Sequence, residues 1–268
     1  MSQSHISRLD TWRDHEERVI EAIITGLSLL RSEEGLLRLR NELELTDNRK
    51  LEDKISTVLY WYFVKATRQL WQKKRNRKKR GPVSFPKFQI PKPPDPNDRS
   101  SVSIERERKI PDFKWGFVDD TCYNTQEDQY KGDRDFDIEC KRLGKPTSTS
   151  WKLNEQYVKN GIRRFITNEH RYGENESSGA MIGYIENMEL DAIFGEINLV
   201  IITNLEPIPP LSKPSEGWQE HATSRLDHEF ERPFPESPFH LWHFWVDLRG
   251  CYPRKKTLKE NLSSSMQA

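Results

Sequence analysis

The sequence predicts an α/β protein in which a mixed β-sheet core is flanked by helices and preceded by a helical N-terminal region. Residues 1–72 carry apolar residues at helical rather than alternating spacing. Residues 135–141 alternate between apolar and charged side chains, which is typical of a strand with two different faces. An apolar stretch at residues 239–248 is the last expected strand.

The first 48 residues are predicted to form an N-terminal helical region. Residues 18–30 are rich in apolar side chains and lack the alternation of a strand. Gly35 and residues 46–48 are expected to interrupt the helical pattern, and Thr46 or Asp47 is a candidate cap for the helix that follows.

That helix is expected over residues 50–72, where apolar side chains recur at spacings of three and four. Glu52 precedes the apolar Ile55 by about one turn, so its side chain is expected on the buried side of the helix. An equally acceptable reading is that an acid in the first turn only complements the helix dipole.

A basic and proline-rich insertion is expected at residues 73–100. Seven of the eight residues 73–80 are basic, and six prolines follow between Pro82 and Pro96, which excludes a helix there. The basic run can be a solvated tail, a localisation signal or an arm that contacts phosphates. In the last case the nucleic-acid-binding residues are Lys73, Lys74, Arg75, Arg77, Lys78, Lys79 and Arg80.

The rest of the chain is expected to supply the core and a polar tail at residues 253–268. The expected elements are a short strand within 110–118, a loop or hairpin end over 119–134, a helix over 152–169, a strand or helix entry at 179–185 and a helix over 188–202.

Composition excludes several classes of protein. No apolar run reaches the roughly 18 residues of a transmembrane helix, and the first residues lack the apolar stretch of a signal peptide. Three cysteines without a close pair exclude a disulfide framework and give no zinc motif, so a reducing cytoplasm is expected. The net charge of +1 means that any attraction for nucleic acid must be local.

The candidate catalytic group combines Asp112 with Glu139, Cys140 and Lys141. Residues two apart in a strand leave the same face, so Glu139 and Lys141 should lie together. If Asp112 borders a neighbouring strand, its carboxylate can meet that of Glu139, and a hard cation such as Mg²⁺ or Mn²⁺ would relieve their repulsion. The backbone carbonyl of Cys140 is a third candidate ligand, and Lys141 could orient or deprotonate a water. Such a group suits hydrolysis of a phosphodiester.

These residues resemble the PD-(D/E)XK, or restriction-endonuclease-like, nuclease superfamily. The segments IPDF and IECKRLG carry the resemblance, with support from Tyr157-Val158, residues 161–165 and residues 181–184. More narrowly, these segments are similar to those of a group of bacterial predicted nucleases found among restriction and phage-defence functions. The resemblance implies a nuclease domain over residues 49–252, with Asp112 and Glu139 as metal ligands, Lys141 as the catalytic lysine and Glu52 as a further acid facing the site.

Two assignments stay open at this stage. Twenty-seven positions (139 − 112) separate Asp112 from Glu139, and Asp119, Asp120, Asp133, Asp135 and Asp137 compete as second carboxylate. Asp137 is the strongest competitor because it shares the face of Glu139. Arg164 is expected on one helical stripe with Tyr157 and Gly161. It can be a surface arginine or can grip a backbone phosphate or a catalytic carboxylate, and the resemblance favours a functional role, so it is assigned to nucleic-acid binding together with Arg142.

We therefore expect a Mg²⁺-dependent endonuclease that cleaves nucleic acid, with double-stranded DNA favoured over RNA, acting in anti-phage defence or restriction. The alternative is a non-catalytic subunit that keeps the fold and recruits nucleic acid or a partner. The sequence leaves open a homodimer or a partner ATPase or sensor subunit, and it predicts no membrane partner.

Overall fold

The computed structural model describes residues 12–44, 46–47, 50–75, 84–89, 110–118, 123–124, 129–130, 133–205 and 207–252. The predicted basic arm lies outside this part, since nothing is described of residues 76–83 or of the side chains of residues 73–75. The competitors Asp119 and Asp120, the side chain of Asp133 and the predicted tail at 253–268 also lie outside it.

Three helices come first along the described chain, five strands follow, and the remaining helices and strands are interspersed. The helices are α1 (Trp12–Arg31), α2 (Glu33–Glu44), α3 (Leu51–Arg75), α5 (Leu153–Lys159), the 3-10 helix η3 (Ile162–Phe165) and α6 (Leu190–Asn204). The strands are β1 (Lys87–Phe88), β2 (Phe113–Val118), β3 (Tyr123–Asn124), β4 (Gln129–Tyr130), β5 (Asp133–Leu143), β6 (Ser178–Ile185), β7 (Thr223–Phe230) and β8 (Phe239–Asp247).

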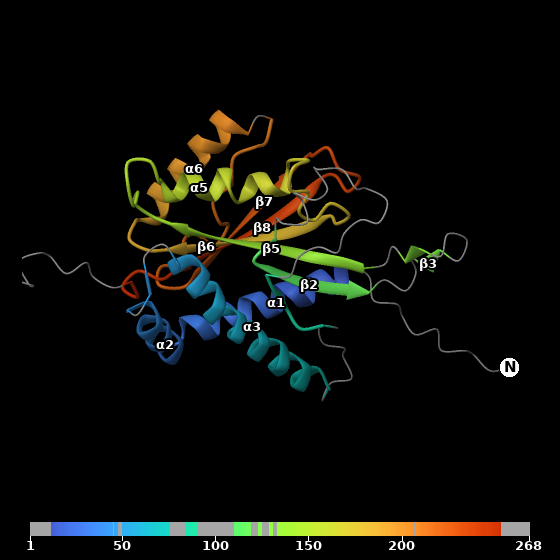
Figure 1. Cartoon of the computed structure of the whole chain (residues 1–268), viewed down its shortest axis with the longest axis horizontal. Helices are drawn as coiled ribbons and strands as arrows, with labels where there is room; N and C mark the ends of the chain where they lie inside the picture. Colours follow the sequence, from blue (N-terminus) through green and yellow to red (C-terminus); the bar gives the residue numbers. More distant parts are fainter. Residues whose placement is uncertain are drawn as a thin grey trace, which may run out of the picture.

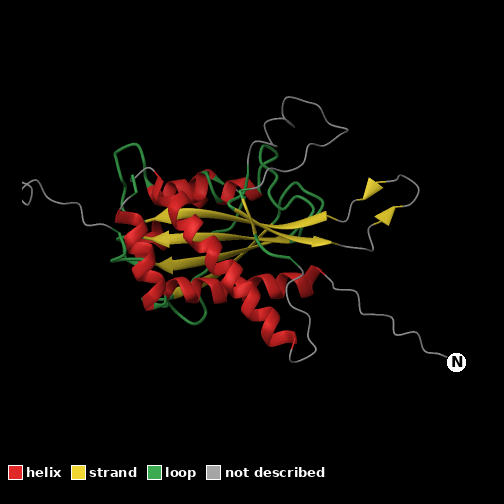
Figure 2. Cartoon of the chain, turned by 60° about the horizontal axis from the view of Figure 1, so that its bottom comes forward, coloured by secondary structure: helices red, strands yellow, loops and turns green. Residues whose placement is uncertain are grey.

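Six strands form one mixed sheet in the order β1-β2-β5-β6-β8-β7. The strands are the yellow arrows in Figure 2. The central pairs β5/β6 and β6/β8 are parallel, whereas β1/β2, β2/β5 and β7/β8 are antiparallel. All eight residues of β6 are buried, as expected for a central parallel strand that is covered on both faces. The prediction of a mixed α/β sheet flanked by helices is confirmed.

The N-terminal helices α1, α2 and α3 cover one face of the sheet (Figure 1). They bury an apolar cluster that includes Ile23 and Phe63 from the helices and Trp115, Ile138 and Phe244 from the strands. Burial of these large side chains removes apolar surface from water and ties α3 firmly to β5. This contact places the first turn of α3 over the strand that carries Glu139.

The opposite face of the sheet is covered by α5, η3 and α6 (Figure 1). Tyr157, Phe165 and Ile197 from these helices pack against Met181 and Trp245 of the strands. The sheet therefore separates two apolar cores, and the charged face of β5 points toward the second one.

Three details of the sequence-based prediction are wrong. The helix expected over 152–169 is broken after Lys159 and continues only as η3, because Gly161 has φ −123° and ψ −86° and so leaves the helical path. Gly35 does not interrupt a helix; the break is at Ser32, and Gly35 lies in α2. Strand β7 was not predicted, because its inward positions include the polar Ser224 and His228.

None of the helices in the described ranges combines the length and the apolar character needed to cross a membrane.

Candidate active site

Strand β5 presents Glu139 and Lys141 on the same face, as its alternation predicts. Phe136, Ile138 and Cys140 point the other way, into the core under α1 and α3. The Nζ atom of Lys141 lies 2.7 Å from Oε1 of Glu139 and also donates to the carbonyl of Cys140 at 2.7 Å. Both charged side chains are buried, so this ion pair is shielded from water.

Asp112 lies directly before β2 and opposite Glu139 when the antiparallel register of β2 and β5 is continued by one residue, since Phe113 faces Ile138. Its Oδ2 accepts the backbone N–H of Cys140 at 2.7 Å. Burial, followed by the nearby Glu139 carboxylate, raises the pKa of Asp112 to about 8. The structure thus brings Asp112 and Glu139 close enough for their charges to oppose each other.

Glu52, in the first turn of α3, joins the same group from the other face of the sheet. Its Oε1 lies 2.8 Å from Nζ of Lys141, and its Oε2 accepts the backbone N–H of Arg142 at 3.1 Å. Its side chain retains 30% of its exposure. Glu52 is therefore a half-exposed acid at the rim of the group, in contact with Lys141.

Arg164 reaches Glu139 from η3. Its Nη1 lies 2.6 Å from Oε1 of Glu139 and 3.2 Å from the hydroxyl of Tyr172. The expected single helical stripe with Tyr157 and Gly161 is wrong, since α5 ends before Gly161. At Gly161 an added Cβ would lie 2.4 Å from Cε of Met181, so the tight turn that leads to Arg164 requires glycine.

The loop that carries Tyr172 is fixed by Arg232, a buried residue at the end of β7. Its guanidinium donates to the backbone carbonyls of Phe165, Tyr172, Gly173, Glu176 and Glu236. The planar fork of arginine suits such multiple contacts. Arg232 thereby holds Tyr172 where it can contact Arg164.

Lys141 and Arg142 of β5 both have acidic partners. Burial opposes the charge of Lys141, but the carboxylates of Glu139, Glu52 and Asp112 outweigh it and raise the pKa of Lys141 above its usual range. Arg142, predicted to bind phosphate, forms an ion pair with Glu186 just after β6. Lys141 is therefore protonated at neutral pH, and the charge of Arg142 is balanced by Glu186.

Asp137, the competing second carboxylate, occupies a different environment. Its Oδ2 accepts the backbone N–H of Gly173 at 2.9 Å, and Nζ of Lys114 lies 4.0 Å from its Oδ1. Asp135 likewise lies 3.3 Å from Nζ of Lys114. The structure thus groups Asp137 with Lys114 and the Gly173 loop, and Asp112 with Glu139 and Lys141.

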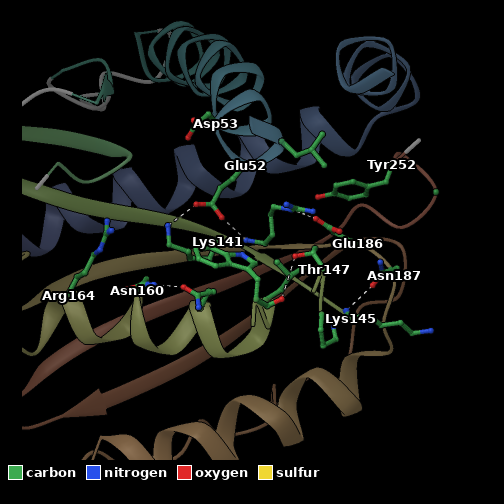
Figure 3. A pocket seen from close by; sticks show the side chains of 17 residues that line it. Glu52, Asp53, Lys141, Lys145, Thr147, Asn160, Arg164, Glu186, Asn187 and Tyr252 are labelled. Carbon is green, nitrogen blue, oxygen red and sulfur yellow. Dashed lines mark hydrogen bonds and ion pairs between the residues drawn. The ribbon is translucent and has the colours of Figure 1, made fainter. Parts of the chain in front are cut away.

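A cleft of about 1350 Å³ lies next to this group, and the residues that contact Glu139 from the cleft side line it. Lys141, Arg164 and Glu52 line it, and Figure 3 shows Glu52 directed toward Lys141. Its walls are formed by segments after β5, β6 and β8, together with the first residues of α3 and α5. The cleft therefore lies at the carboxyl ends of the parallel strands, where α/β proteins commonly bind ligands.

The acids of this group offer a hard divalent cation only a few oxygen ligands. Oε2 of Glu139 is buried and has no hydrogen-bond partner among the described residues, which leaves one carboxylate oxygen available as a ligand. The other two candidate donors are Asp112, which accepts the N–H of Cys140, and the carbonyl of Cys140, which accepts from Lys141. All three donors are oxygens of the kind that Mg²⁺ prefers. In the described part of the chain no three His, Cys, Asp or Glu side chains form a metal-binding group, so the candidate set is two carboxylates and one carbonyl.

Several residues of the site were not identified from the sequence. Tyr172 contacts Arg164, and Glu186 contacts Arg142, but both contacts join residues that are distant in sequence or in different elements, and no local sequence pattern predicts them. Trp151 and Lys145 line the cleft from the loop after β5. The sequence did carry one signal for Trp151 and Lys145. They are an aromatic and a basic residue in a polar loop directly after the strand that carries Glu139 and Lys141.

No protein-family model, no curated protein and no solved structure matches this chain.

Proposed function

We propose that the chain is a metal-dependent nuclease with a restriction-endonuclease-like fold, and that Asp112, Glu139 and Lys141 are its PD-(D/E)XK residues. The observation that carries the proposal is the buried contact of Glu139 with Lys141 near Asp112, where Lys141 also lines a cleft. The order of α3, β2, β5, α5 and β6 is compatible with such a core. Anti-phage defence or restriction, in the cytoplasm, rests on the resemblance of the motifs alone.

Each residue has a distinct role in the proposed reaction. Asp112, Glu139 and the Cys140 carbonyl would hold one or two Mg²⁺ or Mn²⁺ ions, which supply neutralisation of the charge that develops on the phosphate. Lys141 orients the attacking water and does not deprotonate it, because its neighbours keep it protonated. Glu52 fixes the ammonium group of Lys141, and Arg164 fixes Glu139.

The non-catalytic alternative has one observation in its favour. Lys141 and Arg164 both contact Oε1 of Glu139, so two cations already balance that buried charge. A binding subunit that has no metal would keep such pairs for stability, since removing one partner of a buried ion pair is strongly destabilising.

Cleavage of supercoiled plasmid separates the two functions. We expect nicking in Mg²⁺ or Mn²⁺ and none in EDTA, with a loss of roughly 100-fold or more in Lys141→Ala. The matched control is Lys213→Ala, which removes an exposed lysine that pairs with Asp191. Parallel assays on RNA of the same sequence identify the preferred nucleic acid.

If wild type and Lys141→Ala bind DNA equally and neither cuts it with metal, the result contradicts the nuclease function and supports the non-catalytic binding subunit.

A further inference from the structure

Trp151 is an exposed aromatic residue in the wall of the cleft. It lies in the loop 144–152 between β5 and α5, and it is 51% exposed. The sequence holds eight tryptophans, all in the described ranges. Seven of them contact another aromatic or histidine ring of the described residues, and Trp151 contacts none. About half of the surface of Trp151 is therefore open in the cleft, and no other aromatic ring of the described residues is stacked on it.

The loop that carries Trp151 is anchored at its base. Oδ1 of Asn154 accepts the N–H of Gly144 at 2.9 Å. Oδ1 of Asn187 accepts the N–H of Lys145 at 2.9 Å, and Figure 3 shows this second bond. Gly144 has φ +145°, and an added Cβ would lie 2.6 Å from Asn187. At the other end the carbonyl of Trp151 accepts the N–H of Thr147 at 3.0 Å. These contacts present the indole from a defined backbone, which lowers the entropy cost of binding.

Lys145 gives the cleft a cation that suits the phosphate of a nucleotide. Lys145 is exposed and forms no ion pair with the described residues, whereas Lys141 and Arg142 are neutralised by Glu139 and Glu186. Lys145 can therefore contact a phosphate without first breaking an ion pair to an acid of the described residues. A flat aromatic surface near a free cation is the arrangement that binds nucleotides through stacking and phosphate contact.

We propose that this cleft binds an unpaired nucleotide of the nucleic-acid strand, with its base stacked on Trp151 and a phosphate at Lys145. This inference rests on the proposed nuclease function and specifies its substrate. Paired bases in a duplex are stacked on each other and expose only their edges, so they cannot offer a face to Trp151. The preferred substrate is therefore a single-stranded segment, a flap or an end.

The test is binding of a fluorescent 12-nucleotide single-stranded DNA in EDTA, followed by anisotropy. We expect Trp151→Ala to weaken binding by about 5- to 100-fold and Trp151→Phe to retain most of it, because phenylalanine still stacks. Lys145→Ala should weaken binding less and reduce its salt dependence. The control is Trp61→Ala, since Trp61 is 54% exposed on α3 and does not line the cleft.

Duplex DNA and single-stranded RNA of the same sequence complete the experiment. Weaker binding of duplex, unaffected by Trp151→Ala, supports the inference, and equal loss on duplex and single strand overturns it. Unchanged single-strand binding by Trp151→Ala, or binding by Trp151→Phe as weak as by Trp151→Ala, also overturns it.

Cleavage of the same single-stranded oligonucleotide in Mg²⁺ or Mn²⁺ distinguishes failure of this inference from failure of the proposed function. Metal-dependent cutting that Trp151→Ala leaves unchanged rejects the stacking site and keeps the nuclease. Binding that depends on Trp151 without any metal-dependent cutting keeps the stacking site and rejects the nuclease. A wild-type chain that neither binds nor cuts rejects both.

Discussion

Asp112 sets the charge balance of the site. Glu52 and Glu139 are two carboxylates, and Lys141 and Arg164 are the two cations in contact with them. Because burial and Glu139 raise the pKa of Asp112 to about 8, this third acid is largely protonated at neutral pH. Ionising Asp112 therefore calls for one more positive charge, which a divalent cation would supply.

Asp112→Asn should abolish cleavage and raise the thermal midpoint at pH 8.5 by about 2–5 °C. The amide oxygen can still accept the N–H of Cys140. The unfolded carboxyl loses its proton near its ordinary pKa and the folded one only near 8, so wild-type stability falls as pH rises between these values.

Thermal unfolding in EDTA at pH 5 and pH 8.5 measures this difference. The stabilisation by asparagine should be smaller at pH 5, and the control Asp53→Asn, at an exposed acid of α3, should change little at either pH. An equal shift at both pH values would show that the charge of Asp112 is not the cause.

The elements explain which parts of the site could be foreseen. Glu139 and Lys141 follow from the two-residue period of one strand, which needs no knowledge of the rest of the fold. Asp112 depends on the register of β2 against β5, and Glu52 on the packing of α3. Arg164 contacts Glu139 from η3, after α5 has ended at Lys159, so the expected helical stripe is wrong; the resemblance was the reason for selecting this residue.

Two glycines test this description of the elements. Gly161→Ala should destabilise the fold by about 1–3 kcal/mol, because the added Cβ meets the carbonyl of Tyr157 at 2.3 Å and Met181 at 2.4 Å. It should also reduce cleavage, since Arg164 follows this turn. Gly195→Ala should stabilise by about 0.5–1 kcal/mol, because it lies within α6 with nothing within 4 Å of the new methyl group.

Urea unfolding of the two variants provides the measurement. Similar free energies of unfolding for Gly161→Ala and wild type would mean that the turn before η3 is not tightly packed.

At the scale of the whole molecule, the sheet lies between two apolar cores, and a cleft lies at one end of it. The segments after β5, β6 and β8 and the starts of α3 and α5 all meet there, although they are far apart in sequence. The sequence predicted the layers because apolar patterning is local. It did not predict the cleft, because its walls depend on strand order and on the length of the connecting loops.

The net charge of +1 makes local charge decisive for binding. Changing the seven basic residues at 73–75 and 77–80 to glutamine should weaken DNA binding and flatten its salt dependence, by a slope of about 0.9 per lost phosphate contact on duplex. Anisotropy titrations at several salt concentrations measure this slope, with Lys213→Gln as the control. An unchanged slope would exclude the basic run from the DNA contact.

The most direct test of the account is calorimetric titration of Mn²⁺ into the metal-free protein at pH 7.5. We predict binding at one or two sites in wild type and in Lys213→Ala, and its loss in Glu139→Gln, because the glutamine removes the charge of the buried carboxylate. Absence of Mn²⁺ binding to wild type, or equal binding by wild type and Glu139→Gln, would contradict the metal site at Asp112 and Glu139.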